Sequence, residues 1–292
     1  KTGLLIQPDH PLLRLVDAKL LRREGQFQAA ADRLCQIDTT TLPTRLLVAL
    51  YHEIGLSLEQ LGQSEQAYES FTQANLAQLA DARTHHLRPK NYLATAAQLA
   101  DMPLPKPGNT QQFKQDVASP VFLVGFPRSG TTLLDQILDA HPTIQTLEEQ
   151  PITHRLQGEF PVLASDELLD ETTRLAIQQR YFEHVSTHLQ LKANNLLIDK
   201  LPLNLLRVPQ ILRIFPTARF ILALRHPLDV CLSCYMHPFE PNEAMLNFTR
   251  LDSTAQLYSH TMRFWLKCES ELNLSAHRIR YEDLVTNFDT EI

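Results

Sequence analysis

The chain has 292 residues, enough for one large domain or two modest ones. Its hydrophobic content of 43% and charged content of 21% are those of an ordinary globular protein. A net charge of −6 is not typical of general nucleic-acid binding, and no apolar run approaches the ~20 residues that span a bilayer. We therefore expect no nucleic acid and no membrane as partners, and a cytoplasmic location. A targeting segment upstream of Lys1 stays open.

The first third of the chain contains an internal repeat at an offset of 37 residues. Small residues at matching positions would let two helices approach closely, and matched glycines fall at the turns between them. The pattern resembles the helix-turn-helix of tetratricopeptide repeats, whose usual period is ~34 residues. A generic pair of helical hairpins remains an alternative. The matched positions are Ala18 with Gly55, Leu21 with Leu58, Gly25 with Gly62, Ala30 with Ala67, and Leu34 with Phe71.

A proline-rich stretch, MPLPKPGNT, follows a helical segment at 88–100 and cannot continue it. We predict a tetratricopeptide-like helical domain at 1–105, a linker at 106–119, and an α/β domain at 120–292. In the last of these, short apolar runs alternate with helical segments, which indicates a P-loop-like fold with a mainly parallel central sheet. Strands are predicted at 121–125, 143–147, 195–199, 218–224 and 277–280, and helices at 131–140, 166–190, 203–214, 227–237 and 243–271.

Polar residues follow the predicted strands at the points where they end. In an open parallel sheet, ligands bind outside the carboxyl ends of the strands. The first strand is followed by GFPRSGTT, and the second by a pair of glutamates. We expect the four strand ends to bring together a phosphate-binding loop, a carboxylate pair, a lysine and an arginine. The residues at the later three ends are Glu148-Glu149, Asp199-Lys200 and Arg225-His226.

The loop in VFLVGFPRSGTTLLDQIL has the Gly-x4-Gly spacing of a phosphate-cradling P-loop, but Thr131 stands where the loop lysine belongs. Gly125 and Gly130 allow backbone N–H groups to point inward, and the following helix adds its positive end. Arg128 can donate two parallel hydrogen bonds to adjacent anionic oxygens. ATP-using loops need their lysine and usually recruit Mg²⁺. An activated sulfate is a different ligand, because its transferring sulfuryl group carries one less negative charge than a phosphoryl group. An arginine, a lysine and backbone dipoles could then bind it, so we expect no metal.

Three segments together resemble a known enzyme family. PVFLVGFPRSGTTLLDQILDAHPTIQTLEE, LIDKLPLNLL and ARFILALRHPLDVCLSCY look like sulfotransferases that use 3′-phosphoadenosine 5′-phosphosulfate. The chain resembles in particular bacterial sulfotransferases with N-terminal tetratricopeptide repeats, relatives of the tyrosylprotein sulfotransferases. The resemblance covers essentially the whole sequence. Its specificity comes from PRSGTT together with a glutamate 21 residues after Arg128 and the R-(x)7-S spacing of Arg225 and Ser233.

The resemblance implies a role for each matching residue. It assigns Arg225 and Ser233 to the 3′-phosphate of the donor, and it places Tyr281 near the nucleotide. Glu149 matches the catalytic base, and Lys200 matches the lysine that steadies the sulfuryl group and the bridging oxygen. Arg128 is expected to take part in both binding and catalysis. The loop residues implied to hold the 5′-phosphosulfate are Arg128, Ser129, Gly130, Thr131 and Thr132.

The chemistry of sulfuryl transfer agrees with these roles. A phenol has a pKa of ~10 and an alcohol a higher one, so the acceptor hydroxyl needs a base as the S–O bond forms. Glu149 is the candidate, while Glu148 would point elsewhere if the segment were extended. Histidine bases also occur among sulfotransferases, so His154 and His226 remain alternatives. Lys200 would offset charge on the leaving phosphate oxygen.

Other interpretations stay open at this stage. An ATP-dependent kinase would use Asp199 as a Walker-B-like ligand for Mg²⁺, and a binding scaffold would combine the repeats with an inactive α/β domain. Arg225 could instead form a structural ion pair with Asp229. Cys231 and Cys234 have the spacing of a redox pair, but they fall inside a predicted helix and are expected to be small buried residues.

The acceptor is not determined by the sequence. Peptide tyrosine, carbohydrate and small molecules all suit a glutamate base. The repeats could bind a protein partner, form a homodimer or brace the catalytic domain. The resemblance also implies a further C-terminal segment with basic residues after YEDLVTNF, so we expect the sequence to be truncated at Ile292.

Overall fold

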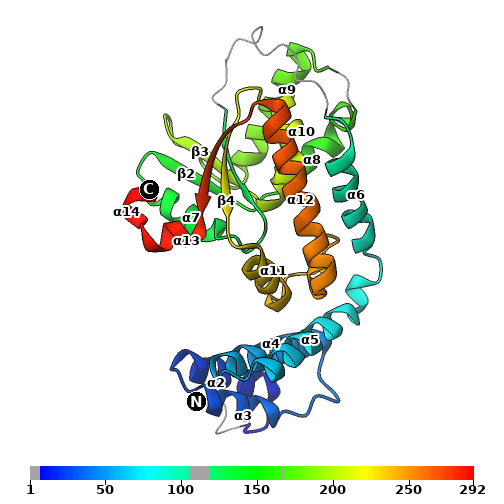
Figure 1. The fold of residues 1–292 in the computed structure, drawn as a ribbon, viewed down its shortest axis with the longest axis vertical. Coiled ribbons are helices and arrows are strands. Elements are labelled where there is room, and N and C mark those ends of the chain that lie inside the picture. The colour runs from blue at the N-terminus through cyan, green and yellow to red at the C-terminus, as the bar shows by residue number, and fades with distance from the viewer. Residues whose placement is uncertain (1–6, 105–118, 166–167) are drawn as a thin grey trace. The chain divides into compact units, whose positions relative to one another are not determined.

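The computed structural model describes residues 7–104, 119–165 and 168–292 (Figure 1). They form two compact units, Lys1–Ala94 with Cys231–Leu257 and Thr95–Val230 with Tyr258–Ile292. The predicted domain limits stay a prediction, although a segment assigned by sequence to the α/β domain belongs to the first unit. The predicted linker at 106–119 lies outside the described residues except for its last residue.

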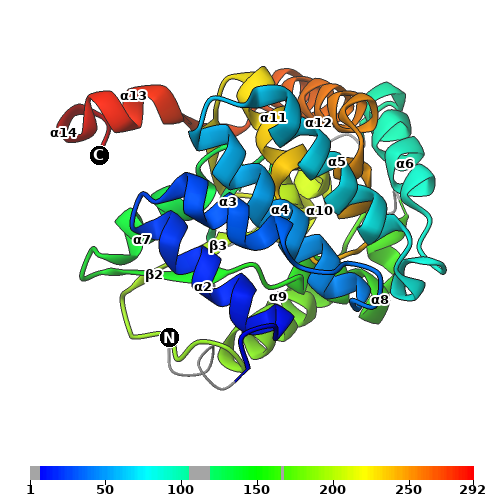
Figure 2. The same cartoon turned by 90° about the horizontal axis from the view of Figure 1, so that it is seen from below.

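The first unit begins with two helical hairpins, in which α2 packs on α3, α3 on α4, and α4 on α5 (Figure 2). Apolar side chains from α2, α3 and α4 form its core, with Leu15, Leu34 and Leu50 buried among them. These pairs confirm the predicted helical hairpins, while membership of the tetratricopeptide class stays a prediction. The helices are α2 (Pro11–Arg23), α3 (Phe27–Cys35), α4 (Thr44–Gln60) and α5 (Ser64–Leu79).

The two hairpin turns have the same geometry. Gly25 and Gly62 adopt φ values of 78° and 72°, a left-handed conformation that favours glycine. The Gly25 N–H donates to Arg22 O at 3.0 Å, and the Gly62 N–H donates to Glu59 O at 2.9 Å. The residue after each glycine donates back to the carbonyl five residues earlier, as in a Schellman motif. The repeat found in the sequence is therefore a repeat of backbone structure.

Helix α5 also holds the end of helix α11 (Pro227–Met236) within the first unit. The Asn75 amide donates to the carbonyl of Tyr235 at 3.0 Å, and the Tyr235 hydroxyl lies 2.7 Å from the hydroxyl of Thr72. The Tyr235 ring stacks on Tyr68, with ring centroids 5.5 Å apart. One residue of α11 is thus held through its carbonyl, its hydroxyl and its ring.

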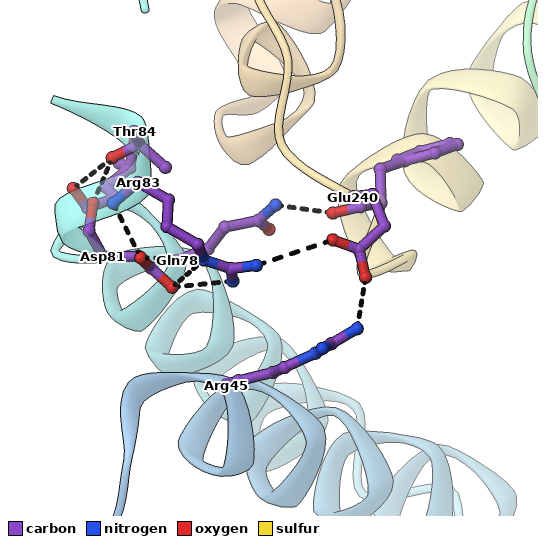
Figure 3. Close-up of polar contacts among 8 residues, drawn as sticks. Arg45, Gln78, Asp81, Arg83, Thr84 and Glu240 are labelled. Atoms are coloured by element: carbon purple, nitrogen blue, oxygen red, sulfur yellow. Dashed lines mark hydrogen bonds and ion pairs between the residues drawn. The ribbon is translucent and has the colours of Figure 1, made fainter. Parts of the chain in front are cut away.

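The loop after α11 is bound by further side chains of the helical unit (Figure 3). Gln78 donates to the carbonyl of Phe239 at 2.6 Å. The carboxylate of Glu240 lies between two guanidinium groups, 2.8 Å from Arg45 and 3.9 Å from Arg83. The unit is completed by η1 (Ala82–Thr84), the start of α6 (Pro89–Asp101), η5 (Met245–Thr249) and the start of α12 (Leu251–Leu272).

The second unit is built on a five-stranded parallel sheet with the order β2-β3-β1-β4-β5. Apolar residues alternate between its faces: in β1, Phe122 and Val124 face one cluster, and Val121 and Leu123 face another. Both faces of the central strand are therefore buried, which accounts for its continuous apolar sequence. The strands are β1 (Val121–Gly125), β2 (Ile144–Glu148), β3 (Leu196–Lys200), β4 (Arg219–Leu224) and β5 (Ser275–Arg280).

Helices cover both faces of the sheet (Figure 1). One face packs against α8, α9, α10 and the second half of α12, from which Trp265 is fully buried. The other packs against α7 and α13 through Leu134 and Leu284. This three-layer α/β arrangement confirms the predicted sheet. Its remaining elements are α7 (Thr131–Asp139), α8 (Ile152–Glu159), η3 (Pro161–Ala164), α9 (Glu171–Ser186), η4 (Pro202–Arg207), α10 (Val208–Ile214), α13 (Tyr281–Thr286) and α14 (Phe288–Glu291).

The strands β2 and β3 end one residue later than predicted, at Glu148 and Lys200. Their last side chains therefore belong to the ladder, where Glu148 pairs with Lys200. Among the described residues, no helix is long and apolar enough to cross a bilayer.

We expect Gly62→Ala to destabilise the helical unit by about 1 kcal/mol, because a Cβ is disfavoured at this left-handed turn. The matched control is Gly158→Ala in helix α8, where nothing lies within 4 Å of the added Cβ. This control should be neutral or stabilising, since alanine favours helix. Calorimetric unfolding of the two variants checks this, and equal stability of Gly62→Ala and the unaltered protein would contradict it.

Candidate functional site

The predicted site residues from four strands lie at one edge of the sheet. Arg128 follows the end of β1, Glu149 follows β2, Lys200 ends β3, and Arg225 follows β4. The strands are parallel, and β1 registers with β3 and β4 on its two sides. The four residues are therefore at the carboxyl edge, as expected.

The strand order places a switch point between β1 and β4. The chain leaves β1 toward β2, past β3, whereas it leaves β4 toward β5 on the opposite side. The two connections diverge above this pair of strands, which is where open α/β sheets bind ligands. The loop with Arg128 and the segment with Arg225 flank this point, and Arg225 Nη1 donates to the carbonyl of Arg128 at 3.4 Å.

The loop after β1 is tightly constrained. Arg128 and Gly130 both have positive φ values, 71° and 93°. An added Cβ at Gly125 would lie 2.7 Å from the carbonyl oxygen of Ala223 and 2.7 Å from the Ser129 hydroxyl. The Ser129 N–H and hydroxyl both donate to the carbonyl of Phe126, at 3.1 and 2.7 Å. In this conformation Ser129 therefore closes the loop.

Helix α7 begins at Thr131, directly after Gly130, and no side chain among the described residues caps it. The first hydrogen bond back to the loop comes from the Leu134 N–H to the carbonyl of Gly130, at 3.1 Å. The earlier amides of a helix have no acceptor within the helix, and its dipole favours an anion there. Thr131 is buried and Thr132 is exposed at this end. The loop and helix start therefore suit an anionic group.

Arg225 is held against Tyr281, which begins helix α13. Its guanidinium carbon lies 4.7 Å from the centre of the Tyr281 ring. The same ring would be 2.6 Å from a Cβ at Gly130, so the glycine allows Tyr281 to reach the loop. The Arg225 Nε is buried and has no hydrogen-bond acceptor within the described residues. That donor suits an anion, and the 3′-phosphate role of Arg225 stays a prediction.

The alternative ion pair between Arg225 and Asp229 is not formed within the described ranges. Glu282 instead accepts a hydrogen bond from the His226 N–H at 2.7 Å. This bond is the main reason that the pKa of the Glu282 carboxyl is lowered. Ser233 lies on α11 in the first unit, and its pairing with Arg225 stays a prediction.

Lys200 is the centre of the carboxylate cluster. Its side chain is 0% exposed, and its Nζ lies 3.0 Å from Glu148 Oε1 and 2.8 Å from Glu149 Oε1. The side chains of both glutamates are more than half exposed to solvent. A fully buried ammonium needs such partners, since an unpaired buried charge is strongly destabilising.

The segment at Glu148 and Glu149 is not extended, so the two side chains do not point apart as they would in a continuous strand. Alternation of side chains holds only in extended backbone, and Glu149 has a left-handed φ of 51°. Its N–H also donates to the carbonyl of Lys200 at 2.7 Å. The chain turns at Glu149 and returns its carboxylate to the same ammonium. The sequence contained the two glutamates but no signal for this turn.

A third carboxyl group, Asp135 on α7, faces the cluster. The side chain is buried, and burial raises its pKa while the charge of Lys200 opposes that shift. In the sequence, its position in an amphipathic helix gives no sign of proximity to β3, so it was not among the predicted site residues. In the described ranges, no group of three His, Cys, Asp or Glu side chains is arranged to hold a metal ion.

Asp199 is turned away from the site. It precedes Lys200 in β3, so its side chain enters the opposite face, where it is 0% exposed. The hydroxyl of Tyr181 on α9 donates to its Oδ2 at 2.6 Å, and burial raises the pKa of the Asp199 carboxyl to about 7. This carboxyl is in the core and away from the carboxylate cluster, and nothing in the described residues supports the suggested Mg²⁺ role.

One of the two alternative bases, His154, contacts an arginine. The Nδ1 of His154 lies 2.9 Å from Arg207, and burial together with that charge lowers the pKa of His154.

Cys231 and Cys234 are free thiols, and burial raises the pKa of Cys231, the opposite of what a reactive thiol requires.

Comparison with known proteins assigns the family. Residues 120–292 match the model of the Sulfotransferase family, and the chain belongs to this family. An uncharacterized protein of Aquifex aeolicus is 32% identical over 142 residues, which cover 44% of this chain and 18% of that protein. Protein-tyrosine sulfotransferase 1 of Danio rerio is 33% identical over 115 residues, 36% of this chain and 32% of the relative.

The chain thus spans about a third or less of the length of these two relatives. The crystal structure of a sulfotransferase from Mycobacterium avium aligns over 90% of this chain and 80% of that one, with 13% identity and a TM-score of 0.37.

We expect Asp199→Asn to change the pH dependence of stability. Because the pKa of Asp199 is raised to about 7 on folding, its stabilising effect is complete below pH ~4 and is lost as the pH rises toward 7. Relative to the unaltered protein, the variant should gain about 2 kcal/mol between pH 5.5 and pH 8. Urea unfolding at both pH values measures this, with exposed Asp289→Asn as control. A constant difference would contradict the buried acid.

Proposed function

We propose that the protein transfers a sulfuryl group from 3′-phosphoadenosine 5′-phosphosulfate to an acceptor hydroxyl, with Glu149 as the general base. The observation that carries this proposal is the buried Lys200 ammonium bound to Glu149 at the carboxyl edge of the sheet. Family membership supports sulfuryl transfer in general. The donor and the base are the specific parts of the proposal.

The donor is a polyanionic nucleotide, and the hydrogen-bond donors and positive charges around the loop after β1 suit it. Amides at the start of α7, the Thr131 and Thr132 hydroxyls and the Arg128 guanidinium would hold the 5′-phosphosulfate. Arg225, with its buried Nε donor, would bind the 3′-phosphate together with Ser233. Tyr281 would limit the nucleotide site beside Arg225. No step of this scheme requires a metal ion.

The catalytic roles follow from where charge develops. Glu149 would accept the proton of the acceptor hydroxyl as its oxygen bonds to sulfur. Lys200 would stabilise the negative charge on the phosphate oxygen as the S–O bond to the donor breaks. Arg128 would bind the oxygens of the sulfuryl group. The direct contact between the Glu149 carboxylate and the Lys200 ammonium, at 2.8 Å, supports assigning both roles to this pair.

Peptide tyrosine is the first acceptor to test, because several relatives are named protein-tyrosine sulfotransferases. Carbohydrate and small-molecule hydroxyls are the next classes. A protein partner or a second copy binding through the helical repeats, and a cytoplasmic location, belong to the same proposal.

Donor binding is tested by thermal-shift titration of the full-length protein. We expect adenosine 3′,5′-bisphosphate to raise the melting temperature without added metal. Its stabilisation should grow with concentration as mass action requires. Stabilisation by MgATP alone would overturn the proposal in favour of a kinase.

Catalysis is tested with Arg128→Ala and Glu149→Gln, using mass spectrometry on a panel of acceptors. Glu149→Gln should lower kcat by about 10²–10⁴-fold, because general-base catalysis typically contributes that much. The control is Glu183→Gln, an exposed residue of α9 paired with Arg180, which should leave the rate unchanged. If both site variants keep full biological activity, the protein acts as a scaffold.

A further inference from the structure

Lys200 is shared between two carboxylates that differ in how the chain holds them. Glu148 is the last residue of β2 and the ladder partner of Lys200, so its backbone is fixed by the sheet. Glu149 lies beyond the strand, at a left-handed residue. Both accept a hydrogen bond from Lys200 Nζ, at 3.0 Å for Glu148 and 2.8 Å for Glu149. Only one of them can be the base that takes the substrate proton.

The ammonium group sets the number of contacts available. A lysine has three N–H donors, and two of them are directed at Glu148 and Glu149. The side chain is fully buried, so water does not replace a lost partner easily. When Glu149 takes a proton, its charge disappears and its attraction for Lys200 falls. The ammonium then needs another anion close by.

We propose that Glu148 is a positioning residue, the permanent counter-ion that keeps Lys200 in place while Lys200 exchanges Glu149 for the leaving phosphate oxygen. The inference rests on the proposed function. In the step, the acceptor O–H proton moves to Glu149 as the acceptor oxygen bonds to sulfur. The bond between sulfur and the bridging oxygen breaks, and adenosine 3′,5′-bisphosphate leaves with that electron pair. As Glu149 is neutralised, Lys200 donates to the negatively charged phosphate oxygen in its place.

The fixed position of Glu148 is what suits it to this role. Its Cα is paired with that of Lys200 in a parallel ladder, so their side chains leave the same face of the sheet. The buried Asp135 on α7 lies on this side as well, but burial raises its pKa, so a buried Asp135 is a weaker counter-ion than Glu148. Glu148 therefore supplies the charge that stays when Glu149 is neutralised.

The test compares Glu148→Gln, Glu148→Asp and Glu149→Gln in a donor-turnover assay that measures release of adenosine 3′,5′-bisphosphate. We expect Glu148→Gln to lower kcat about tenfold while KM for the donor stays within about twofold, because Glu149 still neutralises Lys200 in the ground state and the missing charge matters only once Glu149 takes the proton. Glu148→Asp, which keeps the charge, should recover part of kcat. Full kcat in Glu148→Gln, or a fall in kcat accompanied by a proportional rise in KM for the donor, would overturn the proposal.

Crystal structures separate this inference from the proposed function. In Glu149→Gln soaked with adenosine 3′,5′-bisphosphate, Lys200 Nζ should remain within hydrogen-bond distance of Glu148. Departure of Lys200 from Glu148 would contradict the inference even if the enzyme is active. Absence of donor turnover in the unaltered protein would instead contradict the proposed function, and the inference would fall with it.

Discussion

The burial of one ammonium group against two carboxylates is the constraint on which the candidate site depends. Lys200 ends a strand in the interior of the sheet, and no solvent reaches its side chain. A charge in such a place is tolerated only when opposite charges surround it. The parallel ladder supplies Glu148, and the turn after β2 supplies Glu149. The same arrangement that stabilises the fold therefore leaves a carboxylate and an ammonium group in contact at the edge of the sheet.

A second constraint acts at the loop after β1. Two positive φ values and the close approach of Tyr281 to Gly130 fix the course of the backbone. Helix α7 starts there without a side-chain cap among the described residues, and Arg225 lies against Tyr281 nearby. Positive charge and amide donors thus gather where the strand connections diverge. The carboxylates lie at the same edge, so groups suited to anion binding and groups suited to proton transfer are neighbours.

The helical unit uses its second hairpin as an internal scaffold. Buried Asn75 and Gln78 donate to main-chain carbonyls of Tyr235 and Phe239. Such bonds satisfy carbonyls at and beyond the end of α11 that its own helix leaves without donors. The exposed ion pairs around Glu240 add little, because solvent screens them. The face of α5 that makes these contacts is therefore occupied by the chain itself.

The sequence by itself determined the elements and the edge at which the site lies. The repeat at 37 residues, the glycine turns, the parallel strands and the loop after β1 all follow from local patterns of apolar residues, glycine and proline. Tertiary structure alone decided which carboxylates reach Lys200 and that Asp199 enters the core. The strand end at Lys200 and the left-handed turn at Glu149 determine both results. A shift of one residue reverses the face of a side chain, and no local pattern in the sequence specifies it.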